Sequence, residues 1–358
     1  MRIVQILPTL AYGDAIGNDT IALKNALNEL GYETAIYAEN IGAGIKNKIA
    51  LSLEKMPKLT EQDVIIYHLS TGTVLNEKIA EYSAKKIIMY HNVTPPSFFE
   101  NYDKYIYMIN TWALEGVKFL ANQADYCLAD SELNKKELIK MGYTCDIDVL
   151  PILIPFDDYL KKPDAAIMQK YNDGCTNIIF TGRVVPNKKQ EDVIKSFCYY
   201  KKYFDSTARL FIVGSFKETD TYYQKLQEYV YRLGVKDVFF TGHIRFDEIL
   251  AYYKIADLFL CLSEHEGFCV PLVESMIFDV PIVAYNSSAI PSTLGGAGLL
   301  LESKDPVLVA GAMDRVIRNQ KLREKIIENQ RERLQDFRYE IIKEKFAEYL
   351  QKFCEEVK

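Results

Sequence analysis

The amino-acid sequence predicts an α/β protein with two doubly wound domains, each built on a parallel sheet. Short, almost wholly apolar segments, typical of strands buried on both faces, alternate with segments of helical spacing along nearly all of the 358 residues. The alternation stops in a segment rich in Asp, Lys and Pro, residues 154–177, and then resumes. This order of strands and helices favours parallel sheets with right-handed crossovers, and the interruption favours two domains.

The first half of the chain supplies the strands of the first predicted sheet. One helix is expected over 20–31, because its apolar spacing is helical and Gly31 occupies the usual position after a helix end. The predicted strands are 2–7, 33–39, 63–70, 85–92, 124–131 and 146–155.

The second half repeats the same β/α order. Its predicted strands are 177–181, 208–216, 237–244 and 255–262, with the last ones inside 281–301. Its predicted helices are 190–204, 221–234, 247–256 and 272–279, and two further helical segments finish the chain. Both halves therefore predict the same kind of domain, in which ligands bind beyond the carboxyl ends of the strands.

Composition limits the function classes. A net charge of −6 argues against a nucleic-acid-binding protein, which would normally be basic. Seven scattered cysteines without a CxxC pair indicate reduced thiols and a cytoplasmic location. The first eight residues are too polar for a signal peptide, and no apolar run approaches the roughly 18 residues that a spanning helix needs. We expect a soluble protein.

The segment Ser263–Glu274 combines a loop, a helix start and two carboxylates eight positions apart. Pro271 suits the first turn of the helix, Glu266 lies in the loop, and Glu274 lies about one turn into the helix. A carboxylate can accept from both hydroxyls of a sugar diol. The amides expected to face an anion at this helix start belong to Gly267, Phe268, Cys269 and Val270. The alternative is a capped helix with two solvated glutamates.

These residues carry a family resemblance. The stretch SEHEGFCVPLVESM resembles the E-x7-E signature of the retaining GT-B glycosyltransferases that use nucleotide sugars (glycosyl transferases group 1, family 4 type). The resemblance extends over nearly the whole chain. It implies an acceptor-side domain over 1–160, a nucleotide-sugar domain over 161–338, and a C-terminal helix over 339–358 that crosses back to the first domain.

The resemblance also assigns phosphate-binding residues. Gly182, Arg183 and Lys188 follow a predicted strand, as in the family's pattern of Gly-Arg and Pro-x-Lys. A guanidinium and an ammonium suit a diphosphate, whereas a lone pair of cations at this spacing would more often be a charged surface loop. The family often has Gly after the lysine, where this chain has Lys189, so which lysine reaches the phosphate is open. We expect Lys188.

Histidines at strand ends are the next candidates. His91 occupies the position where the family places a histidine beside the donor sugar, so we expect it to contact that sugar or the leaving phosphate. His68, at the neighbouring strand end, is a weaker candidate on the acceptor side, and His265 is expected to shape its loop. The histidines share no metal-ligand spacing. No metal is expected in catalysis.

Two further motifs are weaker. Asp146 and Asp148 form a DxD, the metal-binding motif of a different glycosyltransferase architecture, but they lie along a predicted strand, where a solvated edge is the simpler interpretation. Gly13 belongs to a loop, residues 13–19, which resembles the family's Gly-rich loop near donor phosphates but lacks Gly-Gly. It is also not the GxGxxG of a dinucleotide-binding protein.

The resemblance implies transfer of a sugar from a nucleoside diphosphate sugar (UDP- or GDP-sugar) to a hydroxyl acceptor, with retention of configuration. The catalytic residues would be His91, Glu266, Arg183 and Lys188, with Glu274 on the ribose. The acceptor would be a glycan or lipid-linked glycan, with peripheral contact at the inner membrane face left open. The alternatives are another GT-B enzyme, such as a nucleotide-sugar epimerase or phosphorylase, and a non-catalytic partner subunit.

Overall fold

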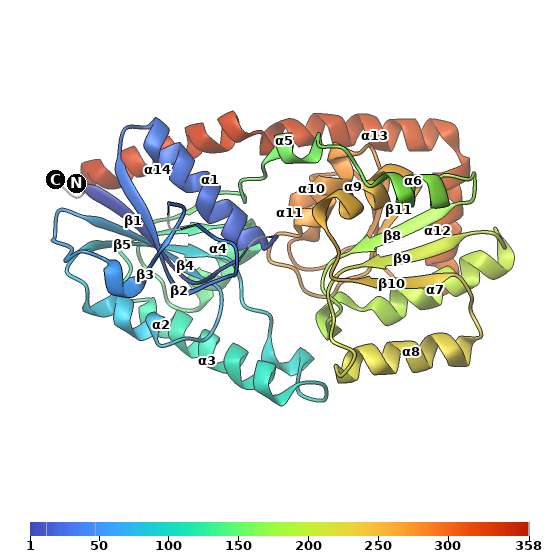
Figure 1. The fold of residues 1–358 in the computed structure, drawn as a ribbon, viewed down its shortest axis with the longest axis horizontal. Coiled ribbons are helices and arrows are strands. Elements are labelled where there is room, and N and C mark those ends of the chain that lie inside the picture. The colour runs from blue at the N-terminus through green and yellow to red at the C-terminus, as the bar shows by residue number, and fades with distance from the viewer. Residues whose placement is uncertain (12, 47, 357–358) are drawn as a thin grey trace. The chain divides into compact units, whose positions relative to one another are not determined.

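The computed structural model describes residues 1–11, 13–46 and 48–356. These residues form two compact units (Figure 1). The first unit contains 1–97, 105–155 and 336–358, and the second contains 98–104 and 156–335. Residues 357 and 358, at the end of the predicted C-terminal helix, lie outside the described residues.

The first unit has a parallel sheet. Within the described residues its strand order is β3-β2-β1-β4-β5-β6-β7. The strands are β1 (Arg2–Leu10), β2 (Glu33–Ile41), β3 (Leu51–Ser52), β4 (Val64–Leu69), β5 (Lys85–Tyr90), β6 (Tyr126–Ala129) and β7 (Ile147–Val149). The predicted strand over 146–155 is shortened to β7, since Pro151 and Pro155 lack the N–H that a ladder requires.

Helices cover both faces of this sheet. They are α1 (Ala15–Glu29), α2 (Leu75–Lys78), α3 (Lys104–Leu120), α4 (Glu132–Lys140) and α14 (Tyr339–Glu356), with 3₁₀ turns η1 (Leu53–Lys55), η2 (Ile79–Glu81), η3 (Pro96–Phe98) and η5 (Gln335–Phe337). Helix α1 begins earlier than predicted because the side chain of Asp14 caps it, accepting from the Gly17 amide at 3.2 Å.

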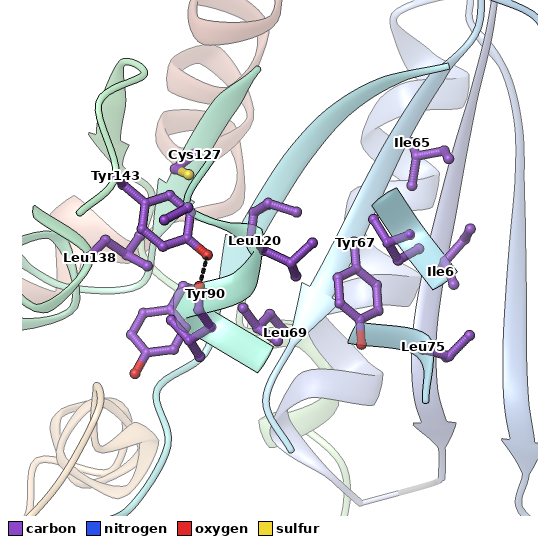
Figure 2. Close-up of a cluster of buried hydrophobic side chains, with 14 of the residues drawn as sticks. Ile6, Ile65, Tyr67, Leu69, Leu75, Tyr90, Leu120, Cys127, Leu138 and Tyr143 are labelled. Carbon is purple, nitrogen blue, oxygen red and sulfur yellow. Dashed lines mark hydrogen bonds between the residues drawn. The ribbon is translucent and has the colours of Figure 1, made fainter. Parts of the chain in front are cut away.

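The core of the first unit lies on both sides of the sheet. One cluster, shown in Figure 2, joins β4, β5 and β6 to α3 and α4, and the Tyr143 hydroxyl donates to the Val117 carbonyl inside it at 2.8 Å. On the other face α14 packs beside α1 (Figure 1) through apolar residues at helical spacing. The buried residues of α14 are Ile342, Phe346, Leu350 and Phe353.

The second unit has its own parallel sheet. Over its described residues the strand order is β10-β9-β8-β11-β12-β13. The strands are β8 (Asn177–Thr181), β9 (Arg209–Val213), β10 (Val238–Gly242), β11 (Leu258–Cys261), β12 (Ile282–Tyr285) and β13 (Leu299–Leu301). An apolar cluster on one face of the sheet packs against α7, α8 and α12.

The helices of the second unit are α5 (Phe156–Tyr159), α6 (Ala165–Tyr171), α7 (Gln190–Tyr203), α8 (Thr221–Leu233), α9 (Phe246–Ile255), α10 (Val270–Ile277), α11 (Ile290–Leu294), α12 (Pro306–Arg318) and α13 (Gln320–Leu334), with the 3₁₀ turn η4 (Pro186–Lys188). The segment 154–177, interpreted from sequence as a polar linker, in fact contains α5 and α6. It also buries Tyr159 and Tyr171. Among the described helices, none combines the length and apolarity required to cross a bilayer.

Candidate functional site

The strand order of the second unit places two loops side by side. Strands β9 and β10 continue from β8 in one direction, and β12 and β13 continue from β11 in the other. The order therefore reverses between β8 and β11, and the loops that follow these two strands flank the reversal. In open parallel sheets a crevice forms at such a point and binds ligands.

Lys188 and Glu266 meet at this point. Lys188 Nζ lies 2.5 Å from Glu266 Oε2, and their side chains are 18% and 6% exposed. Burial disfavours the ammonium, but the Glu266 carboxylate outweighs it and raises the pKa of Lys188. The pair therefore keeps a cation and an anion in place within one largely buried site.

Further contacts tie the two loops together. The Asn187 side-chain amide donates to the His265 carbonyl, and the Glu264 amide donates to the Asn187 carbonyl, each at 2.9 Å. Lys304 pairs with Glu264 and, at 2.6 Å, with Asp192 of α7. The His265 ring is buried and stays neutral, since burial lowers its pKa to about 4. Through its carbonyl, which accepts from Asn187, His265 joins the loop after β11 to the loop after β8.

The helices that follow the loops begin in the same unusual way. Lys189 precedes α7 with φ 52°, Cys269 precedes α10 with φ 72°, and neither caps its helix through its side chain. Within the described residues the amides of Gly267, Cys269 and Val270 have no hydrogen-bond acceptor. Unsatisfied amides at a helix start favour an anion. The left-handed backbone at Lys189 also explains why glycine suits this position.

Glu274 lies in the first turns of α10 and is held by two tyrosines. The hydroxyls of Tyr159 and Tyr253 donate to its Oε1 at 2.8 Å and its Oε2 at 2.7 Å. Burial raises the pKa of Glu274, although both tyrosines counteract it. Each carboxylate oxygen keeps a second lone pair, so Glu274 can still accept from a ligand.

Gly182 and Arg183 follow β8 directly. Gly182 has φ 145°, and a Cβ on the neighbouring Gly214 would lie 1.9 Å from the Gly182 carbonyl oxygen, so both positions require glycine. The Arg183 side chain is exposed, and across the described residues it has no hydrogen-bond or ion-pair partner. Its guanidinium is therefore free to bind an anion. Phe268 is buried, and its carbonyl accepts from the Thr293 hydroxyl at 2.6 Å.

The first unit contains a separate buried polar chain. His91 follows β5, and its Nδ1 lies 2.9 Å from Asp130 Oδ2, while its Nε2 lies 2.8 Å from His68 Nδ1. His68 Nε2 lies 2.9 Å from Gln5 Oε1, and the two imidazole rings stack with an interplanar angle of 3°. Both ring nitrogens of each histidine are thus engaged inside the unit. Neither histidine therefore has a ring nitrogen left over for the sugar contact that the sequence predicted.

The positions of the protons in this row of hydrogen-bonded side chains can be deduced from Gln5, at one end of the row. The Gln5 amide nitrogen donates to the Thr20 carbonyl at 3.1 Å, so the Gln5 oxygen faces His68 and His68 Nε2 must donate to it. Burial lowers the pKa of His68, so its Nδ1 is an acceptor and His91 Nε2 must donate. His91 donates to Asp130 as well. His91 is therefore an imidazolium. Its pKa agrees with this: burial lowers the pKa of His91, but Asp130 raises it by more, so the pKa lies above its ordinary value.

Asp19 lies near this imidazolium. It is 2% exposed and accepts from the Leu153 amide at 2.7 Å. Burial raises its pKa from 3.8 to about 7, although the nearby His91 lowers it. Gly13, in the predicted donor-phosphate loop, is exposed with φ 76° and directly precedes the Asp14 cap of α1.

Two buried groups have side chains of the metal-ligating type. Their ligand atoms lie within 4.8 Å of one another among the residues searched, in the sets Asp19, His68, His91 and Cys261, Glu266, Cys269. In both groups, atoms that could ligate a metal already make hydrogen bonds within the protein; Glu266, for example, accepts from Lys188. The DxD carboxylates of Asp146 and Asp148 instead pair with Lys352 of α14 at 2.5 and 3.5 Å.

Sequence reasoning missed several members of these groups. Tyr159 and Tyr253 hold Glu274, and Gln5, Asp19 and Asp130 surround the two histidines. A signal was available for Asp130, near the end of a predicted strand, and for Asp19, the last residue of the loop 13–19. Tyr253, Gln5 and Tyr159 lie within a helix, a strand and the presumed linker, where nothing local distinguishes them from structural residues.

The two parallel sheets, each doubly wound, define the GT-B fold. HepE from Anabaena in complex with UDP superimposes with a TM-score of 0.76 at 18% identity, over 98% of this chain and 100% of HepE. The sucrose-phosphate synthase of Thermosynechococcus elongatus gives a TM-score of 0.75 at 16% identity, over 99% and 100% of the two chains. At these identities the likeness concerns the fold.

Sequence comparison finds similarity to a glycosyltransferase family in the second unit. Residues 167–333, which lie within the second unit, match the family model of glycosyl transferases group 1. A GDP-mannose-dependent alpha-(1-6)-phosphatidylinositol monomannoside mannosyltransferase of Mycobacterium tuberculosis is 25% identical over 48% of this chain and 47% of its own length. A D-inositol 3-phosphate glycosyltransferase of Acidothermus cellulolyticus is 30% identical over 40% and 34%. The chain thus spans a third to a half of these relatives.

Proposed function

We propose that this protein is a retaining glycosyltransferase that transfers a sugar from a UDP- or GDP-sugar to a hydroxyl acceptor. The observation that carries the proposal is the Lys188–Glu266 pair at the reversal of strand order, beside a helix start with unsatisfied amides. The family of the second unit supports the activity. A relative whose name specifies GDP-mannose and a fold neighbour bound to UDP support a nucleotide-sugar donor.

In this proposal the diphosphate binds at the loops after β8 and β11. Lys188 uses one of its three N–H donors on Glu266 and retains two for phosphate oxygens. Arg183 adds a forked donor, and the amides of Gly267, Cys269 and Val270 add neutral donors. Donors fixed in advance stabilise the charge that develops on a departing diphosphate, which is a large electrostatic contribution to catalysis.

The two glutamates would bind the two sugars of the donor. Glu266 orients the hydroxyls of the transferred sugar, and its pairing with Lys188 couples that sugar to the leaving phosphate. Glu274 accepts from the ribose hydroxyls through the lone pairs that Tyr159 and Tyr253 leave open. Glu274 to alanine should therefore weaken nucleotide binding, whereas Glu266 to alanine should mainly lower turnover.

We assign His91 a contact to the donor sugar or the leaving phosphate. Because its ring nitrogens are bound to His68 and Asp130, this contact would use its main-chain carbonyl or the positive charge of its imidazolium. We assign the reaction no metal. The proposed acceptor is a glycan or lipid-linked glycan of surface polysaccharide synthesis at the cytoplasmic membrane face, since a relative is named for a phosphatidylinositol mannoside.

A thermal-shift screen of nucleoside diphosphates and their sugars tests the proposal. A ligand that binds only the folded protein raises the melting temperature by mass action, so UDP, GDP or one of their sugars should give a concentration-dependent rise. Calorimetric titration of the best ligand then compares Glu274→Ala with Glu328→Ala, a matched change on exposed helix α13. The first should lose at least tenfold in affinity and the second should match the wild type.

Two results would oppose the proposal. If no nucleoside diphosphate or nucleotide sugar binds, the donor assignment fails. If nucleoside diphosphate is released from the bound donor equally with and without hydroxyl acceptors, the protein is not a transferase, and the epimerase and phosphorylase alternatives are favoured.

A further inference from the structure

Two cysteines of the first unit lie in contact. Cys127 Sγ in β6 and Cys145 Sγ in the bend before β7 are 3.6 Å apart. The neighbouring backbones fix this contact, because Cys127 pairs with Ile147 in the ladder and its amide donates to the Asp146 carbonyl at 2.9 Å. Cys127 is fully buried in the apolar cluster beside Tyr143 (Figure 2). The two thiols are therefore held together before any bond forms.

The two thiols differ in access. Cys145 is only half-buried and lines a surface pocket with a volume of 320 Å³, together with Lys135, Asp146 and Lys352. The hydrogen bond from Cys127 lowers the pKa of Cys145, and burial raises the pKa of Cys127. Thiolates rather than thiols react with oxidants, so Cys145 is the sulfur that a small oxidant can reach and that reacts first.

We propose that Cys127 and Cys145 form a reversible oxidation site at which peroxide converts the two thiols to a disulfide. The Cys145 thiolate attacks one peroxide oxygen, the O–O bond breaks, and the second oxygen leaves as water after taking up a proton. Cys145 becomes a sulfenic acid. Cys127 then attacks the Cys145 sulfur, the S–O bond breaks, and a second water leaves with the Cys127 proton. The two sulfurs together lose two electrons, and the peroxide gains them.

The fold accommodates the product. A disulfide requires an S–S distance of about 2.05 Å, so the sulfurs must approach by roughly 1.6 Å. Cys145 lies in the bend before the short edge strand β7 and outside its ladder, whereas Cys127 lies within β6, so the approach needs no change in the strand pairing. The bond would join β6 to this segment and close a loop around α4. The proposal concerns the first unit and does not depend on the transferase activity.

Cys261 and Cys269 provide an internal comparison. They also lie close together, but both are buried in the second unit beside Glu266, and neither is among the residues that line the pocket. If proximity alone decided oxidation, both pairs would react at similar rates. If access through the pocket decides it, the Cys127–Cys145 pair reacts first.

The test is treatment of the full chain with hydrogen peroxide, followed by alkylation of remaining thiols and peptide mapping. We expect a Cys127–Cys145 disulfide as the first oxidation product, with a mass lower by two hydrogen atoms, and its removal by dithiothreitol. In Cys127→Ala, dimedone should trap a sulfenic acid on Cys145, since the second thiol is missing. In Cys145→Ser, Cys127 should stay reduced. Cys198→Ser, at a half-buried cysteine of the second unit, should leave the disulfide yield unchanged.

Three outcomes would overturn the proposal. One is a product in which Cys145 is oxidised without a bond to Cys127 in the wild type. Another is earlier oxidation of Cys261 and Cys269. The third is oxidation of Cys127 in Cys145→Ser at the wild-type rate. The single variants can be compared with the wild type by thermal unfolding, so that a misfolded variant is not taken for an unreactive one.

Discussion

The ion pair of Lys188 and Glu266 allows a quantitative test of the candidate donor site. The two charged atoms lie 2.5 Å apart, and the side chains are 18% and 6% exposed. Removing one partner of a buried pair leaves an unpaired charge and costs about 3–5 kcal/mol. Because Lys188 keeps some contact with water, we expect the lower end, about 3 kcal/mol, for Lys188→Met and for Glu266→Gln.

An exposed pair of the same unit is the matched control. Arg331 and Asp279 lie 2.6 Å apart, at nearly the same separation, but their side chains are 64% and 41% exposed. Water screens such a pair, which typically contributes less than about 1 kcal/mol. A double-mutant cycle at each pair isolates the coupling free energy from other effects of the substitutions. We expect about 2–3 kcal/mol at the buried pair and under about 1 kcal/mol at the exposed pair.

The assay is denaturant unfolding of the full chain, followed by calorimetric titration of the nucleoside diphosphate that binds. Lys188→Met should lower the affinity at least tenfold, which equals about 1.4 kcal/mol. Lys189→Met should change it little, since Lys189 pairs with Glu191 and Glu264 instead. The reasoning fails if the coupling at Lys188–Glu266 is no larger than at Arg331–Asp279. It also fails if Lys189→Met weakens binding more than Lys188→Met.

Three further predictions concern single positions. Asp19 has a pKa of about 7 in the folded chain, against 3.8 for an ordinary aspartate. Between these values the folded state keeps a proton that the unfolded state releases, so the free energy of unfolding should fall by about 2–3 kcal/mol between pH 5 and pH 7. Asp19→Asn should lack this decrease in unfolding measured at both pH values, and an unchanged decrease would contradict the assignment. Tyr253→Phe removes a donor to the Glu274 carboxylate and should cost about 1.5–3 kcal/mol in denaturant unfolding, whereas Tyr231→Phe, at a tyrosine 86% exposed, should cost nothing measurable. Lys189→Gly should be more stable than Lys189→Ala by about 1 kcal/mol, because φ 52° strains any residue with a Cβ; equal melting temperatures would exclude that strain.

Local patterns in the sequence predicted much of the fold. The predicted fold class is confirmed, because a buried parallel strand must be apolar on both faces and the helices between strands keep their own period. Errors occurred where local composition was misleading. The segment 154–177 is polar overall, yet Tyr159 within it is buried and donates to Glu274, 115 residues away. Composition averages over a segment and does not reveal one residue with a distant partner.

The histidines show the same limit. His91 was recognised from its place at a strand end, but its proton state depends on His68, Gln5 and Asp130, which belong to other strands or follow them. No local pattern indicates that one of two neighbouring imidazoles is neutral and the other is charged. That difference follows from burial and from the orientation of a glutamine amide.

By itself the sequence determined the alternation of strands and helices and the placement of Lys188, Glu266 and Glu274 after strands. These follow from periodicity and from turn residues that act within a few positions of the chain. Only the tertiary structure decided which of these side chains meet. Lys188 and Glu266 are 78 residues apart and come together because β8 lies beside β11. Strand order depends on how whole helices and sheets pack, a property that no single segment contains.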